Sequence, residues 1–148
     1  MIRRIAYTEW TRCFSHISPY SGVVDTIKKL RALPLKTAVL SDFPLSDRLE
    51  RLGIDGLWDV KMSSEDTQYL KPSPKPFLMM AERLGMDPGR ILYVGNNYEY
   101  DVMGAAAAGM KTALTGSCLN KKGKADIVFK TYKELWHKII GLYSTGGV

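Results

Sequence analysis

The chain has 148 residues, a hydrophobic content of 45% and a formal net charge of +6. This length is typical of one domain with a buried core, and the composition excludes a largely disordered chain. The longest apolar stretch is too short to span a bilayer, and the N-terminus lacks the apolar core of a signal peptide. We therefore expect a cytoplasmic protein that makes no membrane contact.

The positive charge leaves two interpretations open. Nucleic-acid binding is one, but Lys and Arg are spread along the chain, and the densest run, Lys121 to Lys124, is a short segment that contains glycine. An anionic substrate such as a phosphate ester would also suit a basic surface. Cys13 and Cys118 are far apart and show no metal-ligand spacing, so we expect two reduced thiols.

Helical patterns alternate with short apolar runs along the sequence. The expected helices cover residues 3–16, 23–33, 44–53, 75–84, 98–108 and 132–142. The expected strands cover residues 37–40, 58–62, 91–94, 111–114 and 126–129. This alternation predicts an α/β fold of three layers, in which helices cover both faces of a Rossmann-like parallel sheet. Ligands of such sheets bind at the carboxyl ends of the strands.

The first segment with chemical potential runs from Thr37 to Pro44 and places Ser41 after an apolar strand. A hydroxyl at that position can donate to a phosphate oxygen, although a turn or N-cap serine is the alternative. Asp42 adds a negative charge beside this group. If its side chain points inward, phosphate binding is weakened; if it points away, the charge matters little.

The second segment, Leu70 to Phe77, places Lys71 in a proline-rich loop. Prolines stiffen the backbone, and a fixed ammonium can neutralise a phosphate group. The alternative is a solvated lysine, which is what we expect of Lys75.

The third segment runs from Gly95 to Asp101 and leads from a strand into a helix. Oxygen ligands such as Asp101 and the amide of Asn96 suit Mg²⁺. The alternative is a capping Asn with acidic residues in the first helical turn. Gly104 is expected to let this helix pack closely on the sheet.

In this order and spacing, the three segments resemble motifs II, III and IV of the haloacid dehalogenase-like hydrolases, a superfamily dominated by phosphatases. The resemblance implies that Ser41 and Lys71 are catalytic and that Ser41, Asp42 and Lys71 contact phosphate. It also implies Mg²⁺ as cofactor, held by Asp101 and Asn96. Because Asn96 stands where the family has an aspartate, we expect this binding to be weak.

The first motif of that family, a strand that ends in Asp-x-Asp, does not occur in the sequence. In the family, the first aspartate attacks phosphorus and the second acts as acid and base. The strand that carries them lies between the strands that correspond to 37–40 and 91–94. The resemblance therefore implies a sheet without its central strand. Residues 1–18 resemble the last helix of a cap, and residues 19–148 an incomplete core domain.

Three hypotheses for function follow. The first is a phosphatase-type hydrolase core that is inactive as this chain unless another polypeptide supplies the missing motif. The second is a non-enzymatic phosphate-binding or protein-interaction module, and the third is a nucleic-acid-binding protein. Partners implied by the first are phosphate or a small phosphorylated substrate. Loss of a central strand leaves two unpaired edges, which predicts a homo-oligomer or a complementing chain unless the two edges pair directly.

Overall fold

The computed structural model describes residues 17–45, 47–116 and 125–144. Its helices are α2 (Val23–Arg31), α3 (Arg48–Arg51), α4 (Pro74–Leu84), α5 (Met103–Ala107) and α6 (Tyr132–Ser144). Its strands are β1 (Ala38–Ser41), β2 (Val60–Ser63), β3 (Leu92–Gly95), β4 (Lys111–Thr115) and β5 (Ile127–Phe129). Short turns of other helical types are η2 (Asp55–Leu57), η3 (Ser64–Thr67), η4 (Pro88–Arg90) and η5 (Tyr98–Val102).

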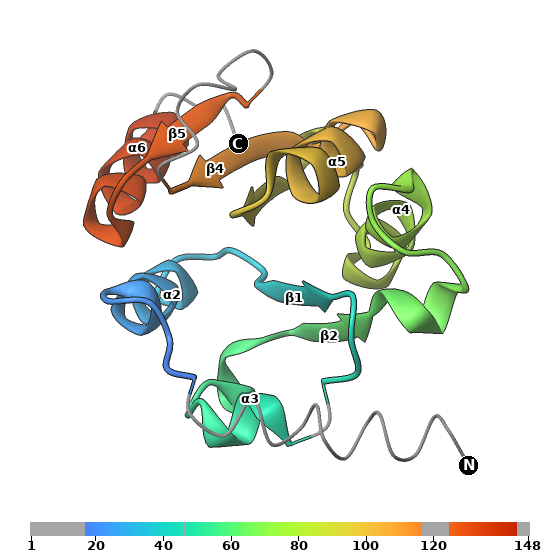
Figure 1. The fold of residues 1–148 in the computed structure, drawn as a ribbon. Helices are drawn as coiled ribbons and strands as arrows, with labels where there is room; N and C mark the ends of the chain where they lie inside the picture. Colours follow the sequence, from blue (N-terminus) through green and yellow to red (C-terminus); the bar gives the residue numbers. More distant parts are fainter. Residues whose placement is uncertain (1–16, 46, 117–124, 145–148) are drawn as a thin grey trace.

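The strands form two separate parallel sheets. One sheet contains β1 and β2, and the other has the order β3-β4-β5. Helices α2 and α6 lie on one side of these strands, and α4 and α5 lie on the other (Figure 1). The predicted three-layer α/β fold is confirmed. The sheet is interrupted between β1 and β3, where the resemblance places the missing strand.

Helix α4 joins the two sheets on one face. Ser73 caps its start, Pro74 occupies its first position, and Gly85 ends it with a φ of 62°. Its apolar side chains pack against Leu40 of β1, against Tyr93 of β3 and against Ile91, which directly precedes β3. The same helix therefore provides core contacts to both halves of the interrupted sheet.

On the opposite face, α6 covers the second sheet. Its buried residues Leu135 and Ile139 pack with Ala113 of β4, and the cluster also includes Leu30 of α2 and Leu92 of β3. No helix among the described residues is long and apolar enough to cross a bilayer.

Two predicted helices differ in their bounds. The helix expected over 44–53 is reduced to Arg48–Arg51. The chain turns directly after β1, where the Ser41 Oγ accepts a hydrogen bond from the Phe43 N–H. The helix expected over 98–108 begins as a π-helical turn and continues as α5. The predicted cap helix over 3–16 and both cysteines lie outside the described residues.

The interruption predicts that the isolated chain self-associates. Strands β1 and β3 do not pair with each other, so direct pairing does not remove the two edges. We expect analytical ultracentrifugation of the purified chain to give a mass that is a multiple of 16.6 kDa. A species that remains monomeric at high protein concentration would contradict this prediction.

Candidate functional site

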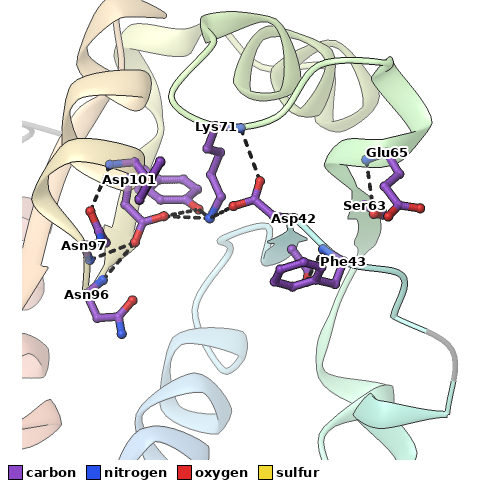
Figure 2. A network of polar contacts seen from close by, with 11 residues as sticks. Asp42, Phe43, Ser63, Glu65, Lys71, Asn96, Asn97 and Asp101 are labelled. Atoms are coloured by element: carbon purple, nitrogen blue, oxygen red, sulfur yellow. Dashed lines mark hydrogen bonds and ion pairs between the residues drawn. The ribbon is translucent and has the colours of Figure 1, made fainter. Parts of the chain in front are cut away.

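The centre of the site is the ammonium group of Lys71. Its Nζ lies 2.7 Å from Oδ1 of Asp101 and 3.5 Å from Oδ2 of Asp42 (Figure 2). Asp42 directly follows β1, Asp101 lies in the turn that follows β3, and Lys71 comes from the loop before α4. The side chains of Lys71 and Asp101 are 11% and 5% exposed, so they form a largely buried ion pair. Lys71 and Asp101 thus meet at the carboxyl ends of the strands, the edge at which the sequence analysis expects ligands to bind.

Asp101 is fixed by backbone donors as well as by Lys71. Its Oδ2 accepts hydrogen bonds from the N–H groups of Asn96 at 3.1 Å and Asn97 at 3.0 Å. Gly95 makes this arrangement possible, because a Cβ atom at that position would overlap the Asp101 side chain. Gly104 acts in the same way for α5, where a Cβ atom would overlap Phe77 of α4 and the Pro72 carbonyl. The close contact at Gly104 is therefore with α4 and the Lys71 loop, not with the sheet as the sequence analysis expected.

Tyr93 is a site residue that sequence reasoning missed. Its hydroxyl lies 3.4 Å from Lys71 Nζ and 3.4 Å from Asp101 Oδ1. Its ring packs edge-on against Phe77, with the ring centroids 4.8 Å apart. The sequence offered one indication of this role: Tyr93 lies two residues before Gly95, and alternate residues of a strand share one face. An apolar strand pattern alone could not show that the hydroxyl reaches the ion pair.

The surroundings of Lys71 keep it protonated. Burial by itself would lower its pKa, but the Tyr93 hydroxyl, Asp101 and Asp42 together raise the pKa above its ordinary value. Burial raises the pKa of Tyr93, and the nearby Lys71 opposes that shift only in part. Lys71 is therefore a fixed cation at neutral pH, suited to electrostatic stabilisation and not to proton transfer.

Asp42 points inward. Besides its ion pair with Lys71, its Oδ1 accepts a hydrogen bond from the Lys71 backbone N–H at 3.2 Å. With both carboxylates ionised, the three side chains Asp42, Lys71 and Asp101 carry a formal charge of −1 (1 − 2 = −1). This is the inward placement that, by the sequence analysis, weakens phosphate binding. A phosphate group near Lys71 would have to compete with both carboxylates.

Ser41 ends β1 beside this network. Its Oγ accepts the Phe43 N–H at 3.1 Å, which is the turn role considered as the alternative in the sequence analysis. The hydroxyl proton is not used in that bond, so it can still be donated to an anion. The catalytic and phosphate-binding roles of Ser41 and Lys71 stay predictions.

The described residues offer Mg²⁺ only an incomplete set of ligands. Asp101 already bonds to Lys71 and to two backbone N–H groups, and the exposed Asn96 directs its side-chain amide away from them (Figure 2). Within the part of the chain that the structure describes, no three His, Cys, Asp or Glu side chains are grouped as metal ligands. Magnesium usually takes one or two carboxylates together with substrate oxygens and water. The metal roles of Asn96 and Asp101 stay a prediction.

Replacing Gly95 with alanine should separate Asp101 from Lys71, because the added Cβ atom takes the space of the carboxylate. We expect the free energy of unfolding to fall by about 2 kcal/mol or more, as for other broken buried networks. Urea unfolding measures this change. Gly56→Ala is the matched control, since nothing lies within 4 Å of a Cβ atom there. Equal effects of the two variants would show that the Gly95 contact with Asp101 is unimportant.

The raised pKa values of Lys71 and Tyr93 predict a loss of stability at alkaline pH. The unfolded chain titrates near the ordinary values of 10.5 for lysine and 10.0 for tyrosine, below the folded values. The stabilisation is therefore complete at neutral pH and is lost as the pH rises above about 10. Urea unfolding across this range should show a smaller alkaline loss for Tyr93→Phe, which removes one of the two titrating groups, than for the exposed control Tyr100→Phe. Identical pH profiles would contradict this account.

A family model described as haloacid dehalogenase-like hydrolase matches residues 1–115. A glyceraldehyde 3-phosphate phosphatase of Methanopyrus kandleri is 37% identical over 102 residues, which cover 67% of this chain and 44% of that protein. The pyrophosphatase PpaX of Halalkalibacterium halodurans is 31% identical, with 68% of this chain and 47% of the relative covered. The chain thus spans less than half the length of these curated relatives.

Solved structures agree with the fold. A HAD phosphatase from Thermococcus onnurineus superimposes with a TM-score of 0.79 at 30% identity, covering 91% of this chain and 64% of that chain. A β-phosphoglucomutase-like protein of Thermotoga maritima gives a TM-score of 0.80 at 21% identity, covering 95% and 68%, which supports the fold alone. The motifs around Ser41, Lys71 and Asp101, the three-layer fold and the matched family model lead to one conclusion: the chain belongs to the haloacid dehalogenase-like hydrolases.

Proposed function

We propose that this chain forms one part of a phosphatase-type phosphoryl-transfer site and is inactive without a nucleophile from another polypeptide segment. The observation that carries the proposal is the position of Lys71, whose ammonium is held between the carboxyl ends of β1 and β3. In a parallel α/β sheet this is where ligands bind. The curated relatives are phosphatases, which supports a phosphorylated small molecule as the substrate class.

Each of the predicted residues has a proposed role. Lys71 neutralises negative charge on the transferring phosphoryl group, and the Ser41 hydroxyl donates to one of its oxygens. Asp42 holds the backbone and ammonium of Lys71 in place, and its own charge reduces the affinity for phosphate. Ser41 and Lys71 position and stabilise the phosphoryl group, but neither forms the covalent intermediate that the family reaction requires.

Phosphatases of this family generally use Mg²⁺. We propose that this chain alone binds the ion weakly through Asp101 and Asn96, because the Asn96 amide brings no charge and the Asp101 carboxylate is already occupied. A further carboxylate would have to come with the missing motif. A cytoplasmic location and partnership with a complementing chain remain part of this proposal.

The purified chain should show negligible hydrolysis of p-nitrophenyl phosphate in the presence of Mg²⁺. Electrostatic groups such as Lys71 lower a barrier, but they do not replace the nucleophile that splits the reaction into two steps. Release of p-nitrophenolate, measured beside Ser41→Ala and Lys71→Ala, tests this expectation. Turnover that is robust in the wild-type chain and lost in both variants would show that the chain carries its own nucleophile.

Anion binding can be measured independently of hydrolysis. Weak binding of inorganic phosphate should survive in the wild-type chain and decrease in Lys71→Ala, as followed by ³¹P NMR. Asp42→Asn should bind phosphate more tightly than wild type, by about tenfold, because it removes a competing charge beside Lys71. Asp47→Asn is the matched control, since Asp47 pairs with Arg51 on an exposed surface. Unchanged binding in Asp42→Asn would contradict the proposed role of Asp42.

A further inference from the structure

The ammonium group of Lys71 has three partners at unequal distances. Nζ lies 2.7 Å from Oδ1 of Asp101, 3.4 Å from the hydroxyl of Tyr93 and 3.5 Å from Oδ2 of Asp42. A lysine ammonium carries three rotatable donors on a flexible stem, so the acceptors around it decide where it points. The shortest contact places the ammonium on the β3 side of the site, and the longest reaches the carboxylate that follows β1.

Asp101 is the partner that the ammonium cannot readily give up. Its Oδ2 accepts hydrogen bonds from the N–H groups of Asn96 and Asn97, and its side chain is 5% exposed. If Lys71 moved away, a buried carboxylate would lose the cation beside it, which is costly. The pair of Lys71 with Asp101 is therefore expected to persist when another anion enters the site.

Asp42 is held differently. Its side chain is 24% exposed, and its two oxygens have separate partners, because Oδ1 accepts the Lys71 backbone N–H at 3.2 Å and Oδ2 faces the ammonium. Water can solvate Oδ2 when it leaves the ammonium, while Oδ1 keeps its hydrogen bond to the backbone. Asp42 can thus release the charge of Lys71 without leaving its place after β1.

Tyr93 contacts both members of the persistent pair from a fixed position. Its hydroxyl accepts from Lys71 Nζ and donates to Asp101 Oδ1, each at 3.4 Å, and its ring packs edge-on against the fully buried Phe77. Nζ is 6.0 Å from the centroid of the Tyr93 ring, so the ammonium meets the oxygen and not the ring face. Both hydrogen bonds are long, so the hydroxyl contributes more to direction than to strength.

We infer that Tyr93 is a positioning residue, whose hydroxyl keeps the ammonium of Lys71 against Asp101. An arriving phosphate oxygen therefore replaces Asp42 as a partner of Lys71 and leaves the pair with Asp101 intact. Without the hydroxyl, the flexible stem can follow Asp42, and phosphate then competes with a closer ion pair. The inference rests on the proposed function, because it assigns the order in which the partners of Lys71 are exchanged at that site.

Titration of the full wild-type chain with inorganic phosphate at neutral pH tests this order of exchange. The side-chain carboxyl ¹³C signal of Asp42 should shift with phosphate concentration by more than that of Asp101. Asp47, whose exposed carboxylate pairs with Arg51, serves as the control for ionic strength. A larger shift for Asp101 than for Asp42 would overturn the inference.

A double-mutant cycle separates positioning from packing. Tyr93→Phe should weaken phosphate binding by about fivefold or more, because the ammonium of Lys71 can then move toward Asp42. In the background of Asp42→Asn the same change should have little effect, since no competing carboxylate remains on the β1 side. A purely structural role would give equal losses in both backgrounds. Tyr100→Phe is the matched control, because Tyr100 is 50% exposed.

The ¹⁵N signal of the Lys71 ammonium supplies a measurement that needs no phosphate. Tyr93→Phe should shift this signal and speed the exchange of its protons with water, whereas Tyr100→Phe should leave both unchanged. If the wild-type chain binds no phosphate, the proposed function fails, and this signal still decides whether Tyr93 positions the ammonium.

Two results with Tyr93→Phe would overturn the inference. One is an unchanged ammonium signal of Lys71, and the other is an equal loss of phosphate affinity with and without Asp42→Asn. Circular dichroism verifies that the variants are folded. If Tyr93→Phe does not fold, the phosphate titration of the wild-type chain decides the question by itself.

Discussion

The ammonium group of Lys71 holds the two halves of this fold together at their carboxyl edge. It pairs with Asp42 beyond β1 and with Asp101 beyond β3, so it spans an interruption that no strand crosses. The pair with Asp101 is largely buried, and a buried lysine without its partners would be costly. Helix α4 supports the two halves from one face through contacts to both sheets.

Each sheet is also restrained near the amino ends of its strands, where an aspartate accepts a hydrogen bond from a threonine backbone N–H. Asp59 accepts the Thr37 N–H at 2.7 Å, and Asp126 accepts the Thr112 N–H at 2.7 Å. The Thr37 hydrogen bond is also the main reason that the pKa of Asp59 is lowered. Each sheet therefore has its own internal restraints, which explains how the two halves keep their strand order without pairing with each other.

The sequence predicted the fold class, the strand positions and the edge of the sheet at which Lys71 and Asp101 meet, because these depend on local periodicity and on where strands end. It did not predict the short α3, which begins only at Arg48. It did not identify Tyr93, because a tyrosine in an apolar strand is expected to pack in the core. In the structure its hydroxyl reaches the ion pair. The orientation of Asp42 was open, because a side chain at a strand end can face either way until its partners are placed.

The proposed function places a physical constraint on the site. A segment that supplies the missing nucleophile would bring new polar groups next to Lys71, whose bonds are now made to Asp42, Asp101 and Tyr93. Lys71 stays protonated throughout the neutral range, because its pKa is raised. A new group in the site would therefore replace one of its present hydrogen-bond or ion-pair partners without changing its positive charge. Three groups already compete for that charge. A nucleophile delivered by such a segment would therefore have to displace a carboxylate from Lys71, or arrive with a cation that compensates the excess negative charge.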